Sequence, residues 1–218
     1  MKTISVTLMG TLRLFLSFRR RRFLARGCSS TDISYLDFRK SPTPIAQLEI
    51  RGEAIKQVAS TKFLGTIISS DLKWEENIMG LIKKAQQRLF FLRQLKKHCL
   101  RREILIQFYR TTIESVITSS IMVWYGNSTK KDRKKLDRIV KTAGRIIGAE
   151  LTPVASLFLA RARTRARKIV MDKVHPANYL FRLLPSGKRF GRIKTGTDRF
   201  KDSFYPTAVS ILNGSYPA

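Results

Sequence analysis

Lysine and arginine are the side chains of this sequence with the clearest chemistry to offer, and that chemistry is the binding of anions. They number 43 against 15 aspartates and glutamates, which gives a formal net charge of +28. So large an excess repels itself unless a polyanion neutralises it. If about 6 to 10 of the cations contact phosphates, counterion release supplies sequence-tolerant binding with a steep salt dependence. We therefore expect nucleic acid as the partner, rather than an acidic membrane surface or a small-molecule substrate.

The candidate phosphate-binding residues cluster on segments with helical periodicity. Between Ile78 and Leu95, apolar residues recur every three or four positions, so the cations project from the flanks and the opposite face. A solvated helix face is the alternative interpretation for any single candidate. The basic candidates are Lys83, Lys84, Arg88, Lys96 and Lys97 on this helix, Lys130, Lys131, Arg133 and Lys134 at the start of a later one, and Arg161, Arg163, Arg165 and Arg167 on another. The cations at 130–134 oppose a helix dipole, which makes a phosphate ligand there more favourable.

Groups suited to catalysis or metal binding are sparse. Cys28 and Cys99 lie in separate segments, and His98 and His175 occur in neither an HxD nor an HExxH arrangement. This pattern argues against a disulfide framework and against a zinc site of Cys/His type. We expect no catalytic residue, no metal, no cofactor and hence no enzyme, and a reducing compartment.

The elements that would position the basic residues predict an α+β fold. Short strands are expected in YLDFRK, on either side of a turn at Gly52, and in STKFLGTIIS. So small a sheet needs a helix packed on it, and the helix beginning near Glu75, with Ser70 or Asp71 near its cap, is the candidate.

Further helices follow from local signals in the sequence. They are expected at 101–119, from Ser128 or Thr129 to a stop at Gly148, and from the Thr152 and Pro153 pair onward. The chain then divides into 1–33, a basic extension without regular structure; 34–70, a small antiparallel β-hairpin segment; 71–150, a mainly α-helical bundle; and 151–218, a basic helix followed by an irregular tail.

The first residues have a composition of their own. Residues 1–31 contain no acidic residue and include the block Arg19–Arg22, which is typical of a mitochondrial presequence. A wrongly joined 5′ end has the same composition. A secretory signal is disfavoured because Arg13 interrupts the apolar run, and no window of about 20 apolar residues could span a membrane. We expect a nuclear or cytoplasmic protein, with mitochondrial import as the alternative.

Aromatic residues alternate with cations in the last forty or so residues. Phe181, Phe190, Phe200, Phe204 and Tyr205 stand in a frame rich in glycine and proline. Such residues could stack on bases while the cations follow a phosphate backbone. Equally, they could fix an irregular tail onto the helices.

Several motifs, occurring in order, resemble one family. They are DFRKSPTP, the hairpin around Gly52, STKFLGTIISSDLKW, KKAQQRLFFLRQLKK, FYRTTIESVITSSIMVWYG, DRKKLDRIVKTAGRIIG, and HPANYLFRLLPSGKRF through SFYPTAVSILN. From about Ser34 to Asn213 the sequence resembles the region after the palm in the reverse transcriptase of LINE-type non-LTR retrotransposons. The resemblance implies that Phe63, Leu64 and Gly65 form the primer-grip turn, where glycine permits close backbone approach. It also implies a thumb-like helical bundle that clasps an RNA/DNA hybrid or duplex.

One departure from that family bears on activity. Reverse transcription needs two metal ions held by palm aspartates, typically in an F/YxDD turn. The sequence contains no adjacent pair of aspartates, and it lacks segments resembling the fingers, the catalytic palm or an endonuclease. The resemblance therefore implies a non-catalytic fragment that at most binds nucleic acid.

A second resemblance concerns the middle of the chain. FLGTIISSDLKWEENIMGLIKKAQQRLFFLRQLKK is similar to the N-terminal domain of the eighth AlkB homologue, whose parent protein combines a 2-oxoglutarate dioxygenase with a tRNA methyltransferase. The oxygenase needs an HxD motif and a distal histidine, and the methyltransferase needs a glycine-rich loop; neither is present here. The alternative functions are therefore a tRNA-modification protein by domain type only, or a basic RNA-binding accessory protein.

Overall fold

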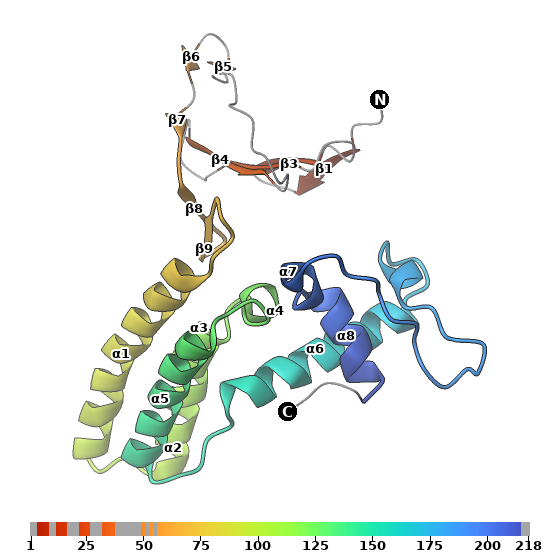
Figure 1. The fold of residues 1–218 in the computed structure, drawn as a ribbon. Helices are drawn as coiled ribbons and strands as arrows, with labels where there is room; N and C mark the ends of the chain where they lie inside the picture. Colours follow the sequence, from red (N-terminus) through yellow and green to blue (C-terminus); the bar gives the residue numbers. More distant parts are fainter. Residues whose placement is uncertain are drawn as a thin grey trace. The chain divides into compact units, whose positions relative to one another are not determined.

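The computed structural model of the chain describes residues 4–8, 12–16, 22–26, 32–37, 49–50, 53–54 and 56–214, with side chains described over 58–214. It divides into two compact units, residues 1–77 and 78–218, which Figure 1 colours from red to yellow and from yellow to blue. Short antiparallel strands precede a mainly helical region, so the α+β prediction is confirmed.

The N-terminal unit contains short strands and the first residues of α1 (Glu75–Lys97). β1 (Ile4–Leu8), β2 (Leu12–Leu16), β3 (Arg22–Arg26) and β4 (Asp32–Asp37) pair antiparallel in chain order, and β4 pairs parallel with β7 (Lys56–Gln57). Residues 1–33 were expected to lack regular structure, and here the structure differs. ISVTL alternates apolar and polar residues, which is the strand period of two, and the charge of the segment obscures that signal.

Two hairpins complete this unit. β5 (Glu49–Ile50) pairs with β6 (Glu53–Ala54), as predicted around Gly52, which itself lies outside the described residues. β8 (Ser60–Phe63) pairs with β9 (Thr66–Ser69). The turn between them has positive φ at both Leu64 (45°) and Gly65 (82°), the type I′ geometry whose twist suits a tight hairpin. The segment expected as one strand is therefore a hairpin that turns within Phe63–Gly65.

A compact turn leads from β9 into the first helix. The hydroxyl of Ser69 donates to Oδ1 of Asp71 at 2.6 Å, and the backbone N–H of Lys73 donates to the same oxygen at 3.0 Å. These hydrogen bonds, that of Ser69 foremost, stabilise the charged carboxylate and lower the pKa of Asp71 to about 2. Asp71 thus organises the turn before the helix, and it stands four residues before Glu75, the first residue of α1.

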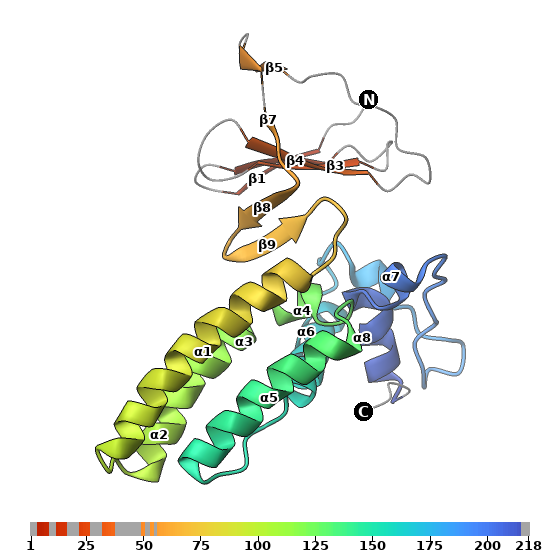
Figure 2. The same cartoon turned by 60° about the vertical axis from the view of Figure 1, so that its left-hand side comes forward.

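The helical unit contains three columns of helix side by side (Figures 1 and 2). α1 (Glu75–Lys97) begins in the first unit and continues into the second. The next column is formed by α2 (Arg102–Phe108), the π-helical segment η1 (Tyr109–Glu114) and α3 (Ser115–Ile117). After the short α4 (Ile121–Trp124), α5 (Lys130–Ile147) forms the third column. The predicted stripe of α1 is buried from Ile78 to Leu92 and half-buried at Leu95, and Trp124 and Leu136 from the other columns are buried as well.

The second column departs from the regular helix predicted at 101–119. Its π segment ends in α3, and Ser120 then takes a left-handed conformation with φ of 49° before α4. Threonine hydroxyls hydrogen-bond back to the preceding turn, as from Thr112 to the carbonyl of Phe108 at 2.6 Å. Such back-bonding competes with the regular ladder, and periodicity alone carries no sign of it.

α5 begins and ends where its capping residues predict. The backbone N–H of Asp132 donates to the Thr129 hydroxyl oxygen at 3.1 Å, and that hydroxyl donates to the Asp132 carboxylate at 2.7 Å. Gly148 closes the helix in a left-handed conformation, with φ of 75°. α6 (Val154–Met171) begins one residue later than expected, with Pro153 at the N-cap and no side-chain cap bond.

The segment after α6 is more ordered than predicted. It contains the 3-10 turn η2 (Asn178–Leu180), α7 (Asp198–Lys201) and α8 (Phe204–Leu212). α8 lies across α6 in Figure 1. Pro206 stands in the first turn of α8, a position where a helix tolerates proline. The proline therefore indicates the start of a helix, although the sequence analysis expected an irregular tail here.

The tail aromatics belong mainly to a second core. Phe181 is buried and makes edge contacts with the rings of Phe190 and Tyr205. Asn213 fastens the loop to α8, since it accepts from the Phe190 backbone N–H at 2.8 Å and donates to the Phe190 carbonyl at 2.9 Å. Four of the five aromatic residues therefore fix the tail onto the helices, which is the second of the two interpretations. The fifth, Phe200, is exposed.

Candidate nucleic-acid interface

One line of cations runs the length of α5. We call the exposed side chains of Lys130, Lys134, Arg138, Lys141 and Arg145 the α5 ridge. They are spaced by four, four, three and four residues, which keeps them on one face of a helix. At 1.5 Å per residue the ridge extends over roughly 22 Å, with about one cation per turn.

The ridge faces outward because the opposite side of α5 faces the core. Leu136, Ile139, Val140, Ala143 and Ile147 are all buried. Lys73 forms an ion pair with Asp71 and Lys135 with Asp132, and within the described part of the chain no ridge residue takes part in such a pair. Like charges three or four residues apart destabilise a helix by about 0.2–0.5 kcal/mol per pair. A polyanion would remove this repulsion.

Three of the candidate phosphate-binding residues form hydrogen bonds inside the fold. Arg133 donates from Nη2 to the carbonyls of Tyr125 (3.0 Å) and Gly126 (2.8 Å) and lies over the Tyr125 ring. Arg88 donates to the carbonyl of Thr112 in the π segment, where the regular ladder is interrupted. Arg161 donates to the Thr118 carbonyl at 2.8 Å. These arginines cap backbone carbonyls between elements, and position along the sequence did not distinguish them from their neighbours.

The remaining basic candidates are exposed but less aligned. On α1, Lys83, Lys84, Lys96 and Lys97 are exposed, yet adjacent helical residues point about 100° apart, so the four do not form one line. On α6, Arg163 and Arg167 share one face and Arg165 lies on another. Lys131 is exposed beside the ridge. The basic helices therefore differ in how their exposed cations are aligned: those of α5 form one line, and those of α1 and α6 do not.

The turn at Phe63–Gly65 lies in the N-terminal unit. The Leu64 side chain is 77% exposed, which fits a turn tip available for contact with another molecule. The basic helices belong to the other unit, so the turn and the ridge are described as separate sites.

Arg138, Lys141 and Arg145 are the ridge residues that the sequence analysis missed. It recognised the dense KKDRKK cluster at the start of α5 and did not follow the cations along the helix. The signal was present, since the four-residue spacing from Lys130 to Lys134 continues into these residues. A helical period applied to the cations, as it was to the apolar residues, would have found them.

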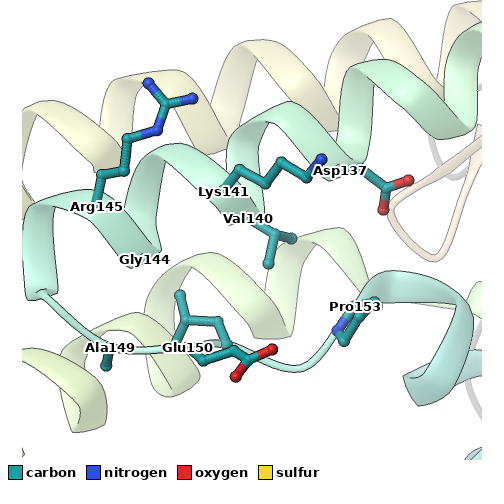
Figure 3. Close-up of a pocket in the computed structure, with 9 residues that line it drawn as sticks. Asp137, Val140, Lys141, Gly144, Arg145, Ala149, Glu150 and Pro153 are labelled. Atoms are coloured by element: carbon teal, nitrogen blue, oxygen red, sulfur yellow. The ribbon is translucent and has the colours of Figure 1, made fainter.

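A hollow of about 570 Å³ adjoins the C-terminal end of the ridge (Figure 3). It lies between α5 and the 149–153 loop, and its lining includes Asp137, Val140, Lys141, Leu151 and Pro153. Burial raises the pKa of Asp137, and the neighbouring Lys141 ammonium opposes that effect. A groove of about 640 Å³ lies between α1 and the second column, lined by Phe91 and Phe108 among others.

Among the described residues, no group of three or more His, Cys, Asp or Glu side chains is arranged to hold a metal ion. No helix in the part of the chain that the structure describes is long and apolar enough to cross a membrane.

Comparison with known proteins matches one segment of the chain to a family model. Residues 74–115 match the family model described as "Alkylated DNA repair protein alkB homolog 8, N-terminal". The matched segment comprises α1, α2 and η1, together with one flanking residue at each end. This supports the second of the two sequence resemblances over that segment. No curated protein and no solved structure matches the chain.

Proposed function

We propose that the chain is a non-catalytic nucleic-acid-binding protein that contacts the phosphate backbone, without base preference along most of its interface, through the α5 ridge. The observation that carries this proposal is the alignment of Lys130, Lys134, Arg138, Lys141 and Arg145 on one exposed helix face. Ammonium and guanidinium groups at a regular spacing suit a linear polyanion. With +28 net charges, a long polyanion also relieves more repulsion than a small anion would.

A membrane surface is the less suitable polyanion. A helix that lies on a lipid surface inserts its apolar face between the headgroups. The apolar face of α5 is instead buried in the helical core, and only its cationic face is available. Cations spaced regularly along one helix face favour a strand of phosphates over a fluid headgroup layer.

The finer proposal is that the chain derives from the primer-grip and thumb region of a LINE-type reverse transcriptase. Two local features support it: a tight hairpin turn at Leu64 and Gly65, and a helical bundle that follows that turn in the chain. In this proposal the preferred ligand is an RNA/DNA hybrid or duplex, and the turn is a second contact.

A second candidate function has its own observation. The match over residues 74–115 to the N-terminal part of an AlkB homologue, which its description calls a DNA repair protein, favours an accessory role in nucleic-acid modification. As the sequence analysis set out, tRNA would then be the natural ligand. Both candidates place a nucleic acid on the basic helices and differ in which one.

The test is equilibrium binding to three fluorescent ligands of equal phosphate number: a primer–template hybrid, a DNA duplex and a tRNA-like hairpin. We expect submicromolar to micromolar binding at 50 mM salt that weakens steeply as salt rises. A preference for the hybrid favours the polymerase-derived origin, and a preference for the hairpin favours the second candidate. Absence of binding at low salt, or affinity that does not change with salt, would overturn the common proposal.

A further inference from the structure

We propose that the hollow beside α5 is a binding pocket for an unpaired guanine nucleotide, with the base against the apolar floor and its phosphate on Lys141 and Arg145. This proposal rests on the proposed function, because it assumes that a nucleic-acid strand lies along the α5 ridge and that one of its bases enters the hollow. It adds a base-selective site to an otherwise sequence-tolerant surface.

The hollow exists because the chain turns back sharply at the end of α5. The backbone N–H groups of Gly148 and Ala149 both donate to the carbonyl of Gly144, at 2.8 and 3.1 Å. A Cβ on Gly144 would stand 2.9 Å from the carbonyl oxygen of Ala149, so glycine permits this close approach. The loop from Ala149 to Pro153 therefore runs beside the helix and forms the second wall (Figure 3).

The floor of the hollow is apolar. Val140 points from the helix toward the loop in Figure 3, and Pro153 lies on the opposite wall; Leu151 also contributes. Aliphatic side chains and a proline ring offer flat contact to a base, which gains from leaving water. The volume of about 570 Å³ lies within the range of about 300–1,000 Å³ usual for small-ligand sites.

Hydrogen-bond acceptors stand on both walls of the hollow. Asp137 lies on α5 and Glu150 on the loop, and both line the cavity. Asp137 is partly buried, and burial raises its pKa because the charged carboxylate loses contact with water. A hydrogen-bond donor on a bound ligand would offset part of this cost of desolvation. The Watson–Crick edge of guanine carries adjacent N1–H and N2–H donors, which match the two oxygens of one carboxylate.

Cations complete the site on its outer rim. Lys141 and Arg145 line the hollow and are also the last residues of the ridge. In Figure 3 Arg145 points away from the loop, and Lys141 runs along α5 toward Asp137. A strand that lies along the ridge thus brings a phosphate to the rim and a base over the hollow. The same cations disfavour a basic peptide as the occupant.

The test compares ligands that differ in a single amino group. Binding of single-stranded 10-mers, uniform except for one central guanosine, inosine or uridine, would be measured by anisotropy, and GMP and IMP binding by ligand-observed NMR. Inosine keeps N1–H and lacks the N2 amino group. We expect guanosine to bind about five- to tenfold more tightly than inosine or uridine, at the lower end of the range for a paired base contact. The substitutions Asp137→Asn and Glu150→Gln, taken together, should remove most of the preference for guanosine. The salt dependence of binding should stay unchanged.

The outcomes separate the two proposals. Strong, salt-dependent binding with equal affinity for guanosine, inosine and uridine overturns the pocket and leaves the proposed function standing. Selective binding of GMP over IMP without oligonucleotide binding supports the pocket and overturns the proposed function. A guanosine preference that survives both substitutions also overturns the pocket. Because Glu150 is exposed, its variant should fold even if the Asp137 variant does not.

Discussion

Neutralising part of the α5 ridge should change the salt dependence of binding by a calculable amount. Each phosphate contact contributes about 0.9 to the slope of log K against log salt on duplex DNA. If the five ridge residues each contact one phosphate, the slope is about −4.5, and affinity falls about 500-fold between 50 and 200 mM salt. The variant Lys130→Gln, Lys134→Gln, Arg138→Gln removes three contacts. Its slope should be about −1.8, and its affinity should fall only about 12-fold over the same range.

The assay is fluorescence anisotropy on a 20-base-pair duplex across that salt range. A matched control carries Lys173→Gln, Lys188→Gln and Lys194→Gln, which removes the same charge from exposed positions outside α5. All six substitutions are at exposed sites, so circular dichroism should give similar melting temperatures. If both variants lose the same slope, binding depends on total charge, and the reasoning from alignment is refuted.

Three further predictions concern the fold. Gly126→Ala should destabilise the helical unit by about 1–3 kcal/mol, measured by urea unfolding, because a Cβ there would stand 2.0 Å from the carbonyl oxygen of Asp202; a neutral result would contradict this packing. Asn213→Ala should cost about 1–3 kcal/mol, because it leaves the N–H and C=O of Phe190 without their partner, and Asn213→Asp, which keeps an acceptor, should cost less. The carboxyl of Asp71 should titrate near pH 2 by NMR rather than at its ordinary value of 3.8; because the pKa is lowered on folding, its stabilisation of the turn is present above pH 3.8 and is lost as pH falls through about 2, and a midpoint near 3.8 would contradict the Ser69 hydrogen bond.

The helices with clear periodicity and capping signals could be predicted from sequence. Thr129 and Gly148 mark the ends of α5 because capping is a local effect of side chain and backbone. The π segment at Tyr109–Glu114 could not be predicted in this way, because neither the back-bonding of Thr112 nor the hydrogen bond from Arg88 to its carbonyl leaves a sign in the periodicity. α8 also escaped the analysis, since its burial depends on packing against α6 rather than on a strong pattern of its own.

The candidate site was also only partly predictable, because some of its features are local and others depend on tertiary structure. Composition drew attention to lysine and arginine, but it could not tell a cation on the surface from one that hydrogen-bonds inside the fold. Arg133 and Lys134 are neighbours in sequence; the first fastens a loop, and the second stands on the ridge. The hollow depends on the loop after Gly148 lying beside α5, which is a tertiary relation without a sequence motif.

The most direct test of the central claim is lysine footprinting by acetylation and mass spectrometry, with and without a saturating nucleic-acid duplex at low salt. The account predicts strong protection of Lys130, Lys134 and Lys141, and unchanged reactivity at Lys173 and Lys188, which are also exposed. Equal protection of both groups, or protection confined to the lysines outside α5, would contradict it.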